Sequence, residues 1–540
     1  MRQAGATTGL DLETAQALAE QTGVCIRPLS FRVTDRATGA SQVVEVACGA
    51  RLARGCPPCA RKTRAARIAQ CRDGWHLEDE PERERPVGGR VIDGDERAWM
   101  REFRDEVRSK RDAALAAGET REAEDWAAVL AGHEAEMGQA GVGLEARRRV
   151  RSTRRRQEAP ALPKRAMRPT TVGRAFTTPD GRILRPSMFI TLTLPSYGRV
   201  HGGLPVNPET YDYVGAARDS LHFGKLIDRF VQNLRRAAGW NVQYFAVVEP
   251  QRRLAPHLHM AIRGTLPRAD LRQVIAATYH QVWWPAVNEV RYEGDHLPKW
   301  EDGVGYVDRE TGEILPTWEE ALDTLETDRN AEPRHVMAFG AQADIRGVVA
   351  GSRDADLSIK YLAKYLTKSL GEAVAEVAEA ADDGARDSAR RVHVRRLVEA
   401  LRWEPCSARC SNWLRFGIQP ENAKREMEPG RCPKAAHRAE RLGYGGRRVL
   451  VSRQWSGKTL GGYQQARRAW VVEALGLEEA DADRFVWQKL SATDAQLAPL
   501  PERLMRLVAD RMAGRARLAA SMVAEQGPPG DGGSGVGGAL

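Results

Sequence analysis

Alternating apolar and polar positions predict strands in the middle of the chain. Residues 189–194, Phe-Ile-Thr-Leu-Thr-Leu, alternate strictly, and residues 256–262, Pro-His-Leu-His-Met-Ala-Ile, alternate before a short apolar run. The apolar run 244–248 is joined to 256–262 by a short turn, which favours an adjacent antiparallel pair. We predict a further strand over residues 335–339.

Helical periodicity accompanies these strands. It predicts an amphipathic helix over residues 215–238 that ends at Gly239, a second helix over 266–282, and a third over 355–371. Four strands with helices between and after them predict an α+β fold.

The N-terminal third is charged and interrupted by turn signals. Residues 9–21 favour a helix, residues 26–46 a β-hairpin and residues 60–70 a basic helix. After a linker rich in Pro and Gly, residues 96–158 predict two charged helices, broken near 138–143.

The patterns divide the chain into five parts. Within the fourth part, residues 372–402 and 478–520 are predicted to be helical. The expected parts are a Cys-rich lobe (1–79), a linker with charged helices (80–164), a central α+β domain (165–371) with an acidic insertion (295–331), a helical, Cys-containing region (372–525) and a Gly/Pro-rich disordered tail (526–540).

The overall charge adds one constraint. Lys and Arg number 82 against 72 Asp and Glu, which gives a net charge of +10 and a pI near 9.3. This balance fits a polyanionic partner, although a genome rich in G and C produces the same arginine content. Since neither a membrane-length apolar run nor the apolar core of a signal peptide is present, we expect a cytoplasmic protein without a membrane partner.

The strand 256–262 carries the first candidate chemistry. Side chains two apart on a strand share a face, so His257 and His259 lie side by side. An adjacent antiparallel strand brings Glu249 next to them. Two imidazoles and one carboxylate can hold a divalent metal and leave open positions for water or a phosphate oxygen.

Two tyrosines follow in the predicted helix 355–371. Tyr361 and Tyr365 are four residues apart and share one helix face, and Lys364 and Lys368 each follow a tyrosine by three residues. A tyrosine beside a metal-activated phosphate is a nucleophile that can form a covalent phosphotyrosine.

In this order, the stretches resemble the motifs of HUH-endonuclease rolling-circle replication initiators (Rep) of actinobacterial plasmids and integrative elements. Glu249 also has the spacing of a metal-binding Glu in related viral Reps, eight residues before the first His. The first motif matches residues 189–194, the His-hydrophobic-His motif matches 257–259, and the Tyr-x-x-Lys motif matches 361–364 and again 365–368.

The resemblance implies a central antiparallel sheet with the metal site on one face. Glu249, His257 and His259 would bind Mg²⁺ or Mn²⁺. The expected partners are origin DNA, both double-stranded and single-stranded, and the host helicase and polymerase.

The resemblance also implies how the strand is cut. Tyr365 is the expected first nucleophile and Tyr361 the second; the protein would remain linked to a 5′ phosphate and later rejoin the strand. Lys364 or Lys368 would stabilise the developing charge or orient the phosphate.

The eight cysteines fall in two groups, which in an intracellular chain suggests metal rather than disulfides. Cys48, Cys56 and Cys59 follow the predicted hairpin and resemble a zinc ribbon. A looser second zinc site consists of Cys406, Cys410, Cys432 and His437.

The fourth ligand of the first zinc site can be Cys25, Cys71 or His76. A continuous helix over residues 60–70 places Cys71 about 18 Å along its axis from Cys59. Both cannot then bind one ion, so we favour Cys25.

Basic and aromatic residues provide the candidate DNA contacts. The residues that we assign to DNA binding are Thr191, Thr193, Arg61, Arg64, Arg154 and Arg155. Trp413, Phe416, Tyr444 and Trp455 lie among Arg447, Arg448 and Arg453, where they can stack unpaired bases or form a core. The stretch 456–459, Ser-Gly-Lys-Thr, lacks the frame of a P-loop, so we expect no ATPase.

Two other functions use the same features. A transposase or relaxase of the same superfamily shares the chemistry, although the tyrosine of conjugative relaxases lies near the N-terminus. A zinc-dependent DNA-binding regulator without catalysis would use only the cysteine clusters and the basic helices.

Overall fold

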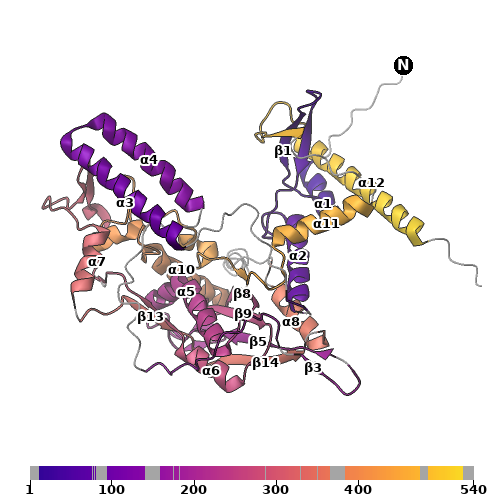
Figure 1. The fold of residues 1–540 in the computed structure, drawn as a ribbon, viewed down its shortest axis with the longest axis horizontal. Helices are drawn as coiled ribbons and strands as arrows, with labels where there is room; N and C mark the ends of the chain where they lie inside the picture. Colours follow the sequence, from indigo (N-terminus) through magenta and orange to yellow (C-terminus); the bar gives the residue numbers. More distant parts are fainter. Residues whose placement is uncertain are drawn as a thin grey trace, which may run out of the picture. The chain divides into compact units, whose positions relative to one another are not determined.

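The computed structural model describes residues 11–75, 77, 79–80, 94–139, 158–173, 175–181, 183–285, 287–328, 330–349, 351–364, 366, 384–474 and 484–526 (Figure 1). The chain divides into two compact units. The larger comprises residues 1–81, 158–323 and 333–540, and the smaller comprises residues 82–157 and 324–332.

A five-stranded antiparallel sheet lies at the centre of the larger unit (Figure 1). The predicted strands 189–194, 244–248 and 256–262 are confirmed as its three inner strands, while the two edge strands were not predicted. In spatial order the strands are β14 (Ala343–Val349), β5 (Pro186–Leu192), β9 (Pro256–Ile262), β8 (Tyr244–Pro250) and β15 (Val449–Val451).

The predicted strand 335–339 forms, but outside this sheet. It is β13 (His335–Ala338), which pairs with β10 (Tyr279–Val282) in a separate two-stranded sheet. The helix predicted over 266–282 is therefore too long: α6 covers Arg268–Ala277, and the chain becomes extended at Thr278.

The two faces of the central sheet pack against different elements because side chains alternate along each strand. One face packs against α5 (Tyr213–Ala238) through Phe223, Leu226 and Phe230. The helix predicted over residues 215–238 is confirmed as α5. Asp212 accepts a hydrogen bond from the Gly215 amide at its start, and Gly239 ends the helix with φ 77°. The other face packs against α8 (Arg353–Lys364).

The N-terminal lobe is completed by the other end of the chain. It contains α1 (Leu12–Thr22), β1 (Leu29–Asp35), β2 (Ser41–Val46) and α2 (Pro57–Trp75), so the predicted hairpin and basic helix are confirmed. β1 also pairs with β16 (Phe485–Lys489), and α12 (Leu500–Gln526) packs against α1. The helix predicted over 478–520 is therefore wrong in its first part.

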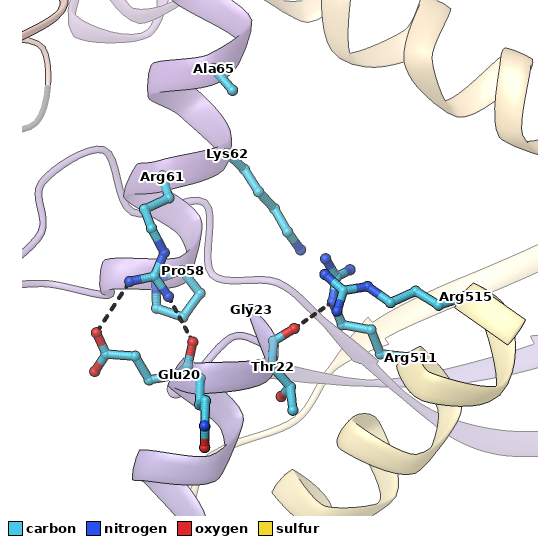
Figure 2. Close-up of a pocket in the computed structure, with 10 residues that line it drawn as sticks. Glu20, Thr22, Gly23, Pro58, Arg61, Lys62, Ala65, Arg511 and Arg515 are labelled. Atoms are coloured by element: carbon cyan, nitrogen blue, oxygen red, sulfur yellow. Dashed lines mark hydrogen bonds and ion pairs between the residues drawn. The ribbon is translucent and has the colours of Figure 1, made fainter. Parts of the chain in front are cut away.

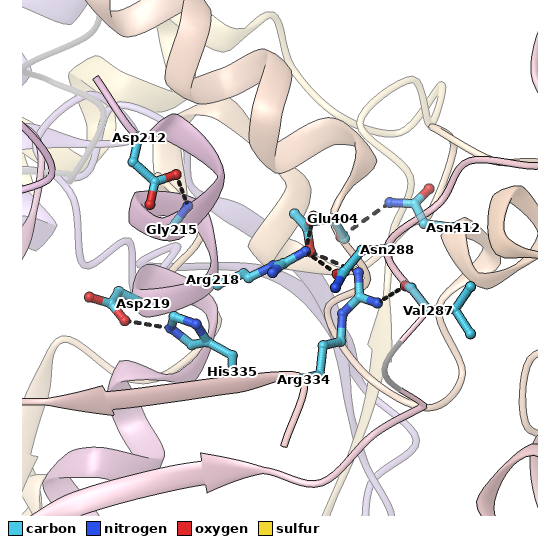
Figure 3. Close-up of polar contacts among 10 residues, drawn as sticks. All are labelled: Asp212, Gly215, Arg218, Asp219, Val287, Asn288, Arg334, His335, Glu404 and Asn412. Carbon is cyan, nitrogen blue, oxygen red and sulfur yellow. Dashed lines mark hydrogen bonds and ion pairs between the residues drawn. The ribbon is translucent and has the colours of Figure 1, made fainter. Parts of the chain in front are cut away.

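The C-terminal region is anchored to α5 by a buried ionic network (Figure 3). The carboxylate of Glu404, which follows α10 (Gly384–Trp403), accepts hydrogen bonds from Arg218 of α5 at 3.1 Å and from Arg334 at 3.3 Å. The side chain of Arg334 is only 2% exposed and also donates to the Val287 carbonyl. One carboxylate thus neutralises two guanidinium groups from distant segments.

The remaining elements are short or peripheral. The smaller unit contains a helical hairpin, α3 (Gly94–Ala117) and α4 (Thr120–Gln139), with a turn at Gly118 (φ 76°) that was not predicted; α4 ends at Gln139, within the predicted break at 138–143. No described helix is both long and apolar enough to cross a membrane.

The other short or peripheral elements are β3 (Phe176–Thr177), β4 (Ile183–Leu184), β6 (Val200–His201), β7 (Leu204–Pro205), η1 (Gly294–His296), β11 (Lys299–Glu301), β12 (Gly305–Val307), α7 (Trp318–Thr327), η2 (Ser411–Phe416), η3 (Ala435–His437), η4 (Ala439–Arg441) and α11 (Leu460–Ala474).

Candidate functional site

The β8–β9 pair brings three metal-ligand side chains together. Glu249 is the direct partner of His257 in the antiparallel register, and His259 lies on the same face two residues further on. Glu249 Oε1 is 2.7 Å from His257 Nε2 and 3.4 Å from His259 Nε2. The three donor atoms lie within 4.8 Å of one another, and all three residues are buried.

The hydrogen-bonding capacity of this group is incompletely used. Among the described residues, neither Glu249 Oε2 nor His257 Nδ1 has a hydrogen-bond partner, although both atoms are buried. Buried polar atoms without partners are costly unless something binds them. A divalent cation fits the three donors, because imidazole nitrogen and carboxylate oxygen are common ligands of such ions.

The protonation states also favour a cation. Burial opposes ionisation of Glu249, but hydrogen bonds from His257 and His259 outweigh it and lower the pKa of Glu249 to about 2. Burial lowers the pKa of His257, while its hydrogen bond with Glu249 acts in the opposite direction. An ionised carboxylate beside a neutral imidazole is the state that a metal requires.

Thr191 on β5 orients one of these rings. It pairs with His259 in the register, and its Oγ1 lies 3.0 Å from His259 Nδ1. When a cation is bound, a proton on Nδ1 shared with this oxygen would leave the Nε2 lone pair of His259 available to the ion. We expected Thr191 to contact DNA; the structure places its hydroxyl against the imidazole of a metal-ligand candidate.

Of the two motif tyrosines, Tyr361 belongs to the described residues. Its side chain is 41% exposed, and its hydroxyl lies 3.4 Å from His259 Nε2. The ring meets the His259 imidazole edge to face, with 4.9 Å between centroids, and also touches Phe189. Lys364 is exposed at the end of α8. Tyr365 and Lys368 lie outside the described residues.

The four thiols of Cys25, Cys48, Cys56 and Cys59 lie within 4.8 Å of one another. Cys25 Sγ is 3.8 Å from Cys56 Sγ, and Cys48 Sγ is 3.8 Å from Cys59 Sγ. Burial and the neighbouring thiols raise the pKa of Cys59 well above its usual range, since thiolates in one place repel one another. A cation such as zinc would remove that cost.

The alternative ligand Cys71 lies elsewhere. It is on the same continuous helix as Cys59, and its side chain is buried among Trp75, Ile359 and Trp455. His76 lies outside the described residues.

The second cysteine group also converges. The donor atoms of Cys406, Cys410, Cys432 and His437 lie within 4.8 Å of one another. His437 Nδ1 is 2.8 Å from the Leu401 carbonyl, which fixes the ring so that Nε2, 3.4 Å from Cys410 Sγ, points into the group. This cluster can bind a metal such as zinc.

The predicted DNA contacts have mixed surroundings. Arg61 donates to the Glu20 carbonyl at 2.7 Å and pairs with the Glu20 carboxylate, so it closes the end of α1 (Figure 2). Arg64 donates to the Ala363 carbonyl of α8 at 2.9 Å. The Thr193 hydroxyl donates to the Gln342 carbonyl. Arg154 and Arg155 lie outside the described residues.

The aromatic residues of the C-terminal region do not offer a stacking platform. Trp413, Phe416, Tyr444 and Trp455 are all buried, with at most 4% exposure. The core-packing alternative therefore holds for all four, because a buried ring cannot meet an unpaired base.

Comparison with known proteins gives one family. Residues 11–510 match the RepSA family, described as replication initiator protein, pSAM2. A replication initiator protein of Streptomyces ambofaciens is 35% identical over 111 residues, which cover 14% of this chain and 24% of that protein. The chain thus matches about a quarter of this relative's length. No solved structure matches the chain.

Proposed function

The chain belongs to the RepSA family of replication initiator proteins, and from this premise we propose that it starts DNA replication by nicking one strand of its origin. The observation that carries the proposal is the position of the Tyr361 hydroxyl, 3.4 Å from His259 Nε2, beside a Glu249–His257–His259 group that fits a divalent cation.

The proposed reaction is a transesterification. The tyrosine oxygen attacks the phosphorus of a phosphodiester, the bond to the 3′ oxygen breaks, and a 3′ hydroxyl and a 5′ phosphotyrosine result. The phenol proton passes to solvent, and the leaving oxygen gains a proton. One phosphoester replaces another, so no external energy source is needed.

Each described residue has one part in this scheme. A cation such as Mg²⁺ or Mn²⁺, when bound, would polarise the phosphate. Glu249, His257 and His259 would hold this cation, and Thr191 orients the His259 ring. Tyr361 supplies the attacking oxygen.

The contact with His259 makes Tyr361 our first nucleophile, in place of the Tyr365 expected from the resemblance. Tyr365 then becomes the second nucleophile, which would reverse the link and release the product. Lys364 or Lys368 would orient the phosphate.

Nicking of supercoiled origin DNA tests the proposal. The His257→Ala/His259→Ala variant should lose cleavage at least about 100-fold while still binding the origin, because the imidazoles act on the phosphate and read no bases. EDTA should stop cleavage by the unaltered protein reversibly. Full cleavage by the double variant with metal chelated would refute the assignment.

Mass spectrometry of the covalent adduct identifies the nucleophile. We expect the first adduct on Tyr361, and its loss in Tyr361→Phe, which keeps the ring packed against His259 and removes only the hydroxyl. A first adduct on Tyr365 would restore the order inferred from the resemblance. Absence of cleavage by the unaltered protein, with origin binding intact, would favour a non-catalytic regulator.

A further inference from the structure

A basic groove runs along the open edge of the central sheet. It has a volume of about 820 Å³ and lies between α2, β15 and the start of α11. α2 contacts both α8 and α11 (Figure 1). The residues that line the groove come from both the N-terminal lobe and the C-terminal region. The cations that line it are Arg51, Arg67, Arg441, Arg447, Arg448, Arg453 and Lys458.

All charged residues in the described lining of this groove are basic. None of the described residues that line it is acidic. Arg51, Arg447 and Arg453 are exposed and form no ion pair with a described carboxylate. Burial, together with Arg51 and Arg447 nearby, lowers the pKa of Arg67 to about 10. So many like charges around one hollow favour an anionic occupant.

The groove is close to the proposed catalytic residues. Val449 of β15 pairs with Val247 of β8, which in turn pairs with His259 of β9. These three residues therefore share one face of the sheet, and two strand spacings of about 4.8 Å separate β15 from β9. Leu366, which follows Tyr365 in the sequence, lines the groove itself.

The lining indicates which part of a nucleic acid would fit. None of the described lining residues is aromatic, so the groove has no platform for stacking bases. Its volume is in the range of ligand pockets, about 300–1,000 Å³, which suits a few nucleotides of one strand rather than a duplex. The guanidinium groups match phosphate oxygens.

We propose that this groove binds the sugar–phosphate backbone of single-stranded DNA and holds the strand next to the motif tyrosines. This inference rests on the proposed function for its biological meaning, but the binding itself requires neither metal nor cleavage. Because the groove contacts phosphates only, it accepts any sequence.

Fluorescence anisotropy with a labelled oligo(dT), in EDTA, tests the groove without any nicking. Arg447→Ala/Arg453→Ala should weaken binding at least about 10-fold at low salt. It should also reduce the slope of log K against log salt by about 1.4, since each phosphate contact on a single strand contributes about 0.7.

The matched control is Arg425→Ala/Arg431→Ala. It removes the same charge from exposed arginines that already pair with Asp302 and Glu428. This control should retain the affinity and salt slope of the unaltered protein, and thermal unfolding should show that both double variants remain folded. An identical affinity for the groove variant and the control would overturn the proposal.

Two further arms identify the ligand. Binding of a duplex origin fragment should change little in the groove variant; an equal loss for duplex and oligo(dT) would overturn the single-strand assignment. Competition by micromolar nucleoside triphosphate would instead show a small-phosphate pocket and also overturn it. Since cleavage is not measured, a failure of the nicking proposal leaves these results standing.

Discussion

At the residue scale, the orientation of His259 by Thr191 is the contact most open to test. Partners that hold a metal-ligating imidazole typically change metal affinity by about 10- to 100-fold when they are removed. Thr191→Val keeps the shape of the side chain and removes the oxygen that lies 3.0 Å from His259 Nδ1. We expect the Mn²⁺ affinity, measured by calorimetry, to decrease by about 10- to 100-fold.

The chain offers a matched control two residues away. Thr193→Val removes a hydroxyl that donates to the Gln342 carbonyl rather than to the ring of His259. Its Mn²⁺ affinity should equal that of the unaltered protein. Equal affinities for both variants would mean that Thr191 does not position His259.

Period-two alternation was sufficient to place Glu249, His257 and His259 together, because the face of each side chain follows from its position along the strand. The sequence did not reveal the partner of His259 Nδ1. That contact depends on the register between β5 and β9, which is set by packing across the whole sheet.

At the element scale, the Glu404 network holds the end of α10 against α5. Removing one partner from a buried ion pair leaves an unpaired charge and costs about 3–5 kcal/mol. Glu404→Ala removes the carboxylate partner of Arg218 and of Arg334, whose side chain is 2% exposed. We expect a large fall in the thermal midpoint.

Glu502→Ala is the control for this variant. Glu502 pairs with Arg506 on the surface of α12 at 3.9 Å, and both side chains are more than half exposed. Surface pairs contribute little, so the midpoint should hardly move. A similar, small effect of both substitutions would show that the network does not carry the anchoring.

Local patterns predicted most helices and the inner strands, but not which strands pair with one another. The run 335–339 was predicted as a strand and forms β13. Its local sequence contains no signal that it pairs with β10 instead of joining the central sheet. β15 has only three residues, Val449–Val451, too short for a periodic signal. Both outcomes are decided by long-range pairing.

At the scale of the whole molecule, metal content tests both cysteine groups. The two four-donor clusters predict about two zinc ions per chain, each stabilising the segments that supply its ligands. Elemental analysis should show the loss of one ion in Cys25→Ser and of one in Cys410→Ser. Cys71→Ser should retain both, since Cys71 lies in neither cluster.

A different loss pattern would correct the ligand sets. Loss of zinc in Cys71→Ser with retention in Cys25→Ser would contradict the arrangement around α2. The helix-length argument selected Cys25 from the sequence because the rise per residue is fixed, and the structure brings Cys25 and Cys59 into the same cluster.

The pairing of β1 with β16 sets an order of events during synthesis. Asp35 and its partner Arg484 are 449 residues apart, so at about 5–20 residues per second the ribosome needs roughly 20–90 s to supply the second after the first. During that interval the sheet of the nascent lobe consists of β1 and β2 alone, and an isolated two-stranded hairpin is marginally stable. All four thiols of the first cluster, however, have been made by residue 59. Early metal binding would therefore stabilise the unfinished lobe until β16 and α12 have been synthesised.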